Sequence, residues 1–276
     1  MELEQAVARH YAHGSLEQTI LNALAAAGKD PNHLTIKDLA PVDEFHVGGR
    51  QATVAFAGQF GLRPGMRLLD VGCGLGGAAR YFAHEHGCRV TGIDLSPEYV
   101  NVTNALARRV GLEGRVSCEL GSALALPFEP GSFDGAYMFH VGMNIEHKAR
   151  LFAEVRRVLA PSGLFGIYDV MRLAAGELSF PVPWASGPES SFVSDAATYR
   201  RLLEAEGFEV LKERSRREFA LEIFAQMRAK GAPAGPAPLG LHIVMGANAG
   251  QKVKNMVADI SAGLIAPTEL ICRAAK

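Results

Sequence analysis

The sequence predicts an α/β fold with a doubly wound, mostly parallel sheet of seven strands, and two observations carry this prediction. Between residues 66 and 170, short apolar runs alternate with segments of helical periodicity, which is the pattern of consecutive βαβ units. A glycine-rich turn, "VGCGLGG", follows the first of these apolar runs, where a strand is expected to pass into a helix. Helices are also expected before this region and within the C-terminal part of the chain.

The expected strands are apolar runs flanked by turn residues. Five of them follow one another along the central region, at 67–71, 89–95, 115–120, 133–139 and 164–170. The helices between them have recognisable ends: Ser96 is a candidate N-cap, Pro97 takes the first helical position and Gly111 follows the last turn. A sixth strand is expected after Gly207. We expect a final strand at 269–275 to run antiparallel at the edge of the sheet.

The chain divides into two expected domains. Residues 1–62 are predicted to form an N-terminal helical cap, and residues 63–276 the main domain. Two segments of the main domain are expected to be lid elements, at about 171–194 and at about 218–263. The first is rich in Pro and Ser and holds the single tryptophan, Trp184, which is expected either to cover a substrate or to pack the lid on the core.

Charge and cysteine content exclude several classes of protein. The chain has 28 Lys and Arg against 29 Asp and Glu, so it lacks the basic field that binding to nucleic acid requires. We found neither a signal peptide nor an apolar run long enough to cross a bilayer, so no membrane insertion and a cytoplasmic location are expected. The four cysteines form no C-x-x-C pair, and no metal site is predicted.

The glycine turn has the spacing G-x-G-x-x-G, at Gly72, Gly74 and Gly77, which fits either NAD or another adenosine cofactor. Asp70 stands two residues before the first glycine. A carboxylate there would repel a pyrophosphate, whereas it suits the sulfonium and ammonium groups of S-adenosylmethionine. Asp94 ends the second strand, where an acidic residue can accept hydrogen bonds from ribose hydroxyls. The turn and its two aspartates therefore favour the sulfonium cofactor.

Four stretches, in order, carry a family resemblance: "LLDVGCGLGG", "VTGIDLS", "ALPFEPGSFDGAYM" and "EVRRVLAPSGLFGIYDV". Together they resemble the successive motifs of class I S-adenosylmethionine-dependent methyltransferases. The resemblance is strongest to the small-molecule branch, which includes ubiquinone/menaquinone-biosynthesis, glycine/sarcosine and natural-product methyltransferases. It covers residues 66–170 closely. It implies a Rossmann-like fold, S-adenosyl-L-methionine as cofactor and a small-molecule methyl acceptor, with a homodimer as one option.

The resemblance also implies a cofactor site. Residues in the first two motifs would bind the methionine half, the ribose and the adenine, in that order: Asp70, Gly72, Cys73, Gly74, Asp94 and Leu95. At the adenine, Ser122 stands where the family often has an aspartate, so the contact would pass to Ser122 or to the backbone of Ala123. The segment "VDEFHVGG" resembles a cofactor lid in the family, which implicates His46, Gly48 and Gly49.

The candidate catalytic residues depart from the family pattern. Phe139 and His140 are expected beside the sulfonium, and His140 is a candidate base, with a hydrogen-bonded packing role as the alternative. Asn144 stands where many relatives carry a histidine, and an amide cannot take up a proton. For Tyr11, core packing is preferred over a cofactor-covering role.

Three functions remain open from the sequence. The favoured one is methyl transfer to an N or O atom, or to a C atom, of a small molecule. The others are an NAD-dependent oxidoreductase and a catalytically silent protein that only binds S-adenosylmethionine. No Tyr-x-x-x-Lys hydride site is found to support the oxidoreductase.

Overall fold

The computed structural model describes residues 2–11, 14–229, 238–246 and 248–276. Its centre is one seven-stranded sheet with the order β3-β2-β1-β4-β5-β7-β6. The strands are β1 Arg67–Val71, β2 Arg89–Asp94, β3 Val116–Leu120, β4 Phe133–Phe139, β5 Leu159–Arg172, β6 Phe208–Ser215 and β7 Ile265–Ala274. The pairs from β3 to β5 are parallel, which confirms the predicted doubly wound α/β sheet.

The position of the last strand differs from the prediction. β7 is antiparallel, as expected, but it lies between β5 and β6 rather than at the edge. Nearly all of its residues are buried, including Thr268 and Glu269, as fits an interior strand. β6 forms the edge instead, and its "LKERS" end carries the charged, exposed side chains that are typical of an edge strand.

Helices cover both faces of the sheet because side chains alternate along each strand. Leu69 and Met138 pack with α7 and α8, whereas Leu68 and Tyr137 pack with α4 and α5. The helices are α1 Glu2–His10, α2 Leu16–Ala26, α3 Ile36–Asp43, α4 Gly49–Ala57, α5 Gly77–His86, α6 Pro97–Arg109, α7 Lys148–Val158, α8 Ala196–Ala205, α9 Arg217–Ala229, α10 His242–Met245 and α11 Ala249–Ser261.

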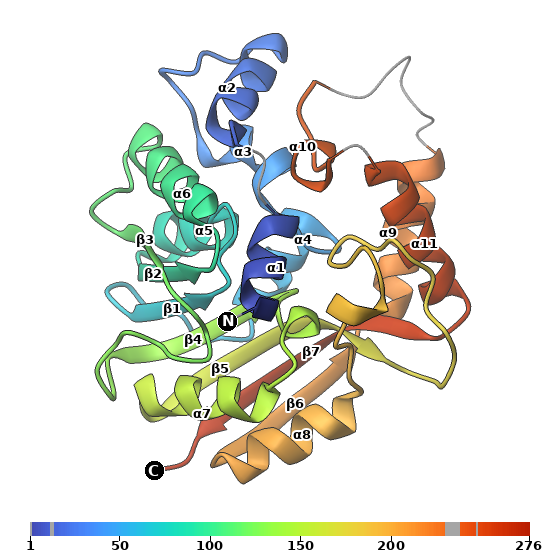
Figure 1. Ribbon diagram of the computed structural model, residues 1–276. Helices are drawn as coiled ribbons and strands as arrows, with labels where there is room; N and C mark the ends of the chain where they lie inside the picture. Colours follow the sequence, from blue (N-terminus) through green and yellow to red (C-terminus); the bar gives the residue numbers. More distant parts are fainter. Residues whose placement is uncertain (1, 12–13, 230–237, 247) are drawn as a thin grey trace.

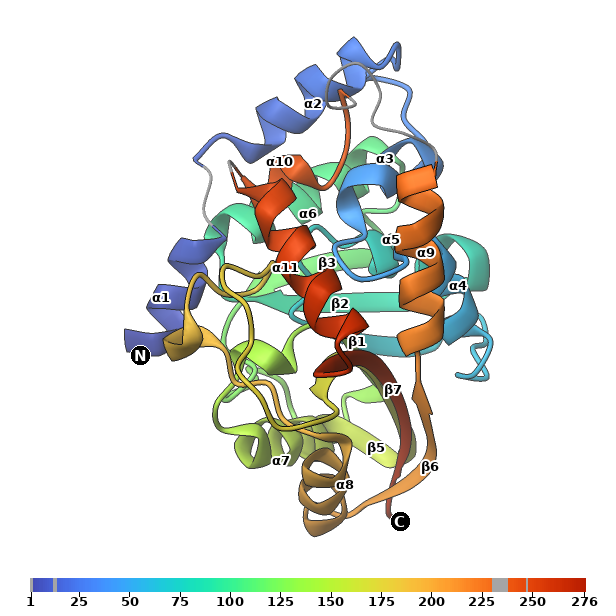
Figure 2. The same ribbon diagram turned by 90° about the vertical axis from the view of Figure 1, so that its right-hand side faces the viewer.

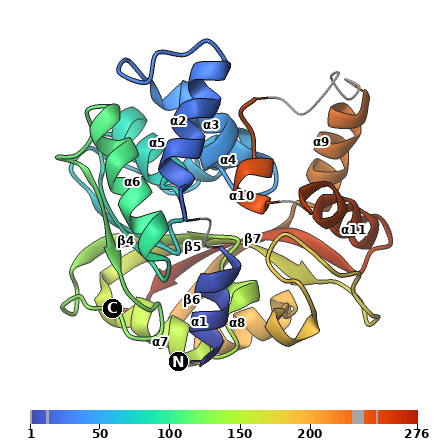
Figure 3. The same cartoon turned by 45° about the horizontal axis from the view of Figure 1, so that its top comes forward.

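Helices α2 to α4, α9 and α11, which lie outside the central βαβ units, are grouped on one side of the molecule. Figures 1 and 3 show α9 and α11 on the side opposite α6, with α2 to α4 between these groups, and Figure 2 shows α11 crossing in front of the sheet. The segment 173–194 is irregular apart from a short turn of 3-10 helix, Pro188–Ser190. Hydrogen bonds tie it to α11, from Ser179 to Asp259 and from Asn255 to the Pro181 carbonyl. Its action as a lid, and the domain boundary at residue 62, stay predictions.

Within the described residues, none of the helices combines the length and the apolar character needed to cross a membrane.

Candidate active site

A cavity opens at the carboxyl ends of β1, β2 and β4, under helix α1. This is the edge at which open α/β sheets bind ligands. All of the predicted site residues line it except Gly48 and Gly49. Those that line it are His46, Asp70, Gly72, Cys73, Gly74, Asp94, Leu95, Ser122, Ala123, Phe139, His140 and Asn144.

Gly48 and Gly49 have a different position from the one expected. They begin α4, and Gly48 adopts a left-handed conformation with φ of 87°. A Cβ at Gly48 would lie 2.4 Å from Cε1 of Phe219, so the glycine permits α9 to pack closely. Gly49 contributes its carbonyl, which accepts a hydrogen bond from His46 Nε2 at 3.1 Å. They support the His46 loop from behind and do not form part of the cavity wall.

The glycine turn is held in place from outside the cavity. The Gly74 N–H donates to Asp94 Oδ2 at 2.9 Å, and the Gly74 carbonyl accepts from Thr103 Oγ1 at 2.7 Å. The neighbouring Leu75 carbonyl accepts from Arg80 Nη2 at 2.6 Å. Gly74 has φ of 54°, and a Cβ there would meet no atom within 4 Å, so a ligand can approach its backbone.

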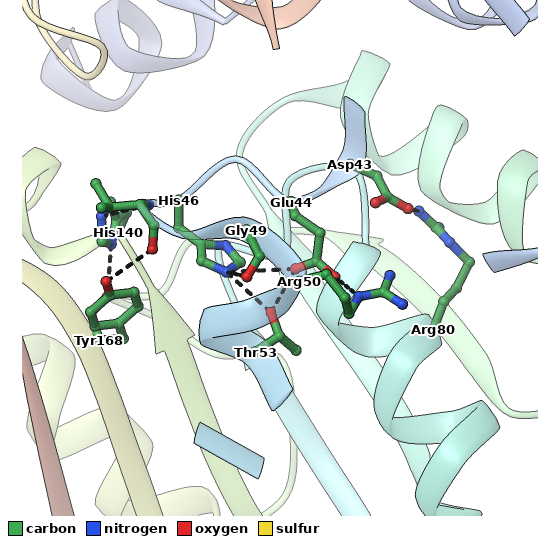
Figure 4. A network of polar contacts seen from close by, with 10 residues as sticks. Asp43, Glu44, His46, Gly49, Arg50, Thr53, Arg80, His140 and Tyr168 are labelled. Carbon is green, nitrogen blue, oxygen red and sulfur yellow. Dashed lines mark hydrogen bonds and ion pairs between the residues drawn. The ribbon is translucent and has the colours of Figure 1, made fainter. Parts of the chain in front are cut away.

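Arg80 also ties the turn to the N-terminal helices. Its Nη2 lies 2.7 Å from Oδ2 of Asp43, at the end of α3, and both side chains are completely buried (Figure 4). A lone buried charge is strongly unfavourable, so each of these groups depends on the other. The ion pair therefore fixes α3 against the start of α5, beside the cavity.

The cavity is acidic. Its lining includes the carboxylates of Glu4, Asp43, Asp70, Asp94 and Glu146, while none of the described lining residues is a lysine or an arginine. Burial raises the pKa of Asp70 to about 8 and that of Asp94 to about 6, the latter opposed by the amides of Ser96 and Gly74. Such a site favours a cation and offers no positive side chain to a pyrophosphate.

His140 is fixed through both ring nitrogens. Its Nδ1 donates to the Tyr168 carbonyl at 3.0 Å, and its Nε2 accepts from the Val47 N–H at 3.2 Å. Burial lowers the pKa of His140 to about 3, so the ring is neutral. The lone pair that a base would need thus accepts the hydrogen bond from Val47, an arrangement that favours the packing role over the role of base.

His46 is likewise neutral. Its Nε2 contacts the Gly49 carbonyl and Thr53 Oγ1, each at 3.1 Å, and Thr53 donates to Glu44 Oε2 at 2.7 Å. Figure 4 shows this chain of contacts continuing to Arg50. Burial lowers the pKa of His46 to about 4. Because Nε2 carries the proton in this arrangement, Nδ1 retains the lone pair of the ring.

Asn144 connects the end of helix α1 to the 173–194 segment. Its Oδ1 accepts from the Tyr11 hydroxyl at 3.1 Å, and its Nδ2 donates to the Trp184 carbonyl at 2.8 Å. Tyr11, at the end of α1, lines the cavity and contacts the rings of Phe45 and Tyr99, so it both packs and covers. The Trp184 ring itself is buried in an apolar cluster, as the packing alternative predicted.

Sequence reasoning did not identify several lining residues. Helix α1 contributes Leu3, Glu4, Val7 and Ala8, and the walls also include Asp43, Phe45 and Tyr99. Asp43 and Phe45 lie in the stretch "VDEFHVGG", but the other five stand in no motif, and α1 reaches the cavity only through contacts across the fold. The apolar periodicity of the N-terminal segment predicts a helix but does not indicate which surface it covers.

Comparisons with known proteins concern the central domain and the fold. A family model described as "Methyltransferase domain" matches residues 69–167. A sterol 24-C-methyltransferase from Gibberella zeae is 35% identical over 113 residues, covering 41% of this chain and 30% of the relative. A probable chloroplastic tocopherol O-methyltransferase from Oryza sativa subsp. japonica is 42% identical over 94 residues, covering 34% and 26%. The chain thus spans about a third or less of the length of these curated relatives.

Solved structures match over longer stretches. The [4+2]-cyclase SpnF is 26% identical, with a TM-score of 0.66 over 99% of this chain and 97% of that one. Geranyl diphosphate C-methyltransferase from Streptomyces coelicolor A3(2), in a complex with S-adenosyl-L-homocysteine, has a TM-score of 0.72 over 100% and 98% at 18% identity. At that identity the second likeness concerns the fold alone. Residues 69–167 therefore match a methyltransferase domain, and the sheet around them has the Rossmann-like fold that the motifs predicted.

Proposed function

We propose that this protein transfers the methyl group of S-adenosyl-L-methionine to an N, O or C atom of a small molecule. The observation that carries the proposal is the acidic cavity beside the glycine turn, with Asp70 and Asp94 in its walls and no described lysine or arginine. This lining suits a sulfonium and an ammonium group. The lining also opposes the alternative of a nicotinamide dinucleotide, because its pyrophosphate would meet no lysine or arginine among the described lining residues.

The cavity has two ends in this proposal. The nucleoside end comprises Asp94, Leu95, Ser122 and Ala123, which would hold the ribose and the adenine. From there the cavity follows the glycine turn, where Asp70, Gly72, Cys73 and Gly74 would hold the methionine half. The acceptor end comprises Phe139, His140, Asn144 and His46. The bound cofactor supplies an electrophilic methyl group on a positively charged sulfur.

The chain's own contribution is mainly to position the reactants and exclude water. The rings of Phe139 and His140 lie in a tight aromatic cluster with His46 and Tyr168, which fixes the wall of the acceptor end. Helix α1 lines the cavity, and Asn144 links Tyr11, which follows this helix, to the 173–194 segment through two hydrogen bonds. A fixed, dry site of this kind lowers the barrier of an in-line displacement without covalent participation by the protein.

The side chains at the acceptor end are poor proton acceptors. His140 uses both ring nitrogens and Asn144 has no basic group, while burial keeps the pKa of His46 at about 4. We infer an acceptor whose nucleophilic atom needs no strong base: an amine that arrives neutral, or an acidic phenol or enol. Curated relatives methylate carbon, oxygen and nitrogen according to their names, so they do not select among these acceptors.

The experiment is a mass-spectrometric screen of amines, phenols and quinols with S-adenosyl-L-methionine, repeated with a trideuteromethyl donor. A product whose added mass follows the label supports the proposal. Saturable binding of the donor without any labelled product in the screen would instead favour the catalytically silent binding protein.

A second candidate function is a cyclisation that uses the same cavity without methyl transfer. It is favoured by the match to a [4+2]-cyclase over 99% of the chain, together with an acceptor end at which both ring nitrogens of His140 are hydrogen-bonded. In the same screen, this function would convert a polyunsaturated substrate into an isomer of unchanged mass and different retention time, with no labelled methyl group.

The remaining expectations about partners and location also stay proposals. A cytoplasmic location and a small-molecule partner rather than nucleic acid are supported by the balanced charge of 28 basic and 29 acidic residues. Assembly into a homodimer is likewise a proposal about the partner of this chain.

A further inference from the structure

Helix α1 places a carboxylate at the nucleoside end of the cavity. Glu4 lines the cavity, and Ser122 Oγ donates a hydrogen bond to its Oε1. Ser122 Oγ in turn accepts from the Leu124 N–H at 3.0 Å, so the hydroxyl is oriented by its own turn. Glu4 and Ser122 are 118 positions apart in the chain, and their contact joins α1 to the turn after β3.

The position of this contact follows from the sheet. Asp94 ends β2, and its carboxylate is oriented by the amides of Gly74 and Ser96, each at 2.9 Å. A ribose held by Asp94 has the glycine turn on one side, since that turn follows the neighbouring strand β1. On the other side lies β3, whose following turn contains Ser122 and Ala123. The base therefore lies toward Ser122 and Glu4.

The chemistry of this corner matches adenine. Adenine presents a donor, its exocyclic amine, beside a ring-nitrogen acceptor. The Glu4 carboxylate only accepts hydrogen bonds. Ser122 pairs with Ala125 in a short antiparallel bridge, whereas the Ala123 N–H has no acceptor within the described residues and can donate. A base with a carbonyl in place of the amine would present its oxygen to the carboxylate, which is unfavourable.

We propose that Glu4 recognises the exocyclic amine of the cofactor's adenine, so that α1 forms part of the nucleoside site. The inference rests on the proposed use of S-adenosyl-L-methionine. It also gives α1 a second role, because the same helix reaches the acceptor end. There Tyr11 donates to Asn144, and His10 Nε2 lies 3.2 Å from the Pro183 carbonyl. Binding of the nucleoside would thus hold the cover over both ends.

The test compares S-adenosylhomocysteine with its deaminated analogue S-inosylhomocysteine by calorimetric titration of the full chain. We expect the wild type to prefer the adenosyl ligand by at least about tenfold, since the analogue leaves the carboxylate facing an acceptor. Glu4→Gln should lose most of this preference, because its amide can donate to the carbonyl of the analogue. Ser122→Asp added to Glu4→Gln should restore it. Glu129→Gln, an exposed substitution outside the cavity lining, is the control and should leave the preference unchanged.

Amide hydrogen exchange supplies a second readout. S-adenosylhomocysteine should slow exchange in α1 of the wild type, and less so in Glu4→Gln. A Glu4→Gln variant that keeps the wild-type preference, or that loses affinity equally for both ligands, would overturn the role of Glu4 while leaving the proposed function intact. A wild type that binds neither ligand would contradict the proposed function, and this inference with it.

Discussion

The two ends of the cavity differ in how their polar groups are bonded. At the nucleoside end, Asp94 is oriented by two amides yet keeps acceptor capacity, because each of its oxygens receives only one of these hydrogen bonds. At the acceptor end, His140 uses both ring nitrogens on the backbone, and Asn144 uses both ends of its amide. The nucleoside end can therefore bind further polar groups, whereas the polar side chains of the acceptor end are held by hydrogen bonds within the protein.

This difference divides the chemistry between cofactor and protein. In the proposed function, the polar nucleoside end would secure the methyl donor, which brings its own reactivity. The acceptor end needs mainly shape, since a sulfonium methyl group reacts once a nucleophile is held in line. The following experiments test that division.

The largest effect is expected from the buried ion pair beside the glycine turn. Arg80→Met should lower the free energy of unfolding by about 3–5 kcal/mol, because it leaves Asp43 buried without its partner. Urea denaturation measures this change. The matched control is Arg67→Met, which breaks a partly exposed pair with Asp134 and should cost less than about 1 kcal/mol. Equal effects of the two substitutions would refute the structural role of the buried pair.

The next effect concerns Asp70 and pH. Burial raises the pKa of this carboxyl to about 8, so the folded protein keeps it protonated where the unfolded chain has lost the proton. The resulting stabilisation is complete below the unfolded pKa of about 4 and is lost as pH rises toward 8. Between pH 5 and 8, Asp70→Asn should therefore gain stability relative to the wild type by up to about 1.4 kcal/mol per pH unit. Parallel pH profiles of urea denaturation for the two proteins would argue against a protonated Asp70.

Asp94→Ala should weaken the binding of S-adenosylhomocysteine by about 1–3 kcal/mol, since the ribose hydroxyls lose their acceptor. Calorimetric titration gives the affinity. Asp134→Ala, whose carboxylate lies at the opposite end of the sheet beside Arg67, is the control and should bind as the wild type does. Unchanged affinity in Asp94→Ala would remove Asp94 from the cofactor site.

The two ends also differ in how far the sequence could predict them. Asp70, Gly74 and Asp94 lie within a few residues of strand ends, and the parallel pairing of β1 with β2 brings them together. Their position follows from local pattern and from the rule that ligands bind at this edge of the sheet. The helices and strands of the central region were predictable for the same reason.

What could not be predicted depends on contacts between distant segments. Glu4 and Tyr11 carry no motif, and only the docking of α1 brings them to Ser122 and Asn144. Likewise, the apolar character of β7 indicated a strand but not its insertion between β5 and β6, which the pairing of the whole sheet decides. The engagement of both His140 nitrogens depends on the loop of Val47, 93 positions away.

The smallest effect is expected at His140. With both ring nitrogens bonded to the backbone and a pKa lowered to about 3, its NMR signals should stay constant between pH 5 and 8. Free imidazole in the same buffer provides the titrating reference. His140→Ala should lower turnover and cofactor affinity together, as expected for a packing residue. A drop in turnover alone of about a hundredfold or more would restore His140 as a base.

The most direct test of the central claim is a pair of calorimetric titrations of the wild-type protein, with S-adenosylhomocysteine and with NADH. The proposed cofactor site predicts saturable binding of S-adenosylhomocysteine, which keeps the adenosyl and amino-acid groups of the methyl donor, at one site and no binding of NADH. Saturable binding of NADH without binding of S-adenosylhomocysteine would contradict it.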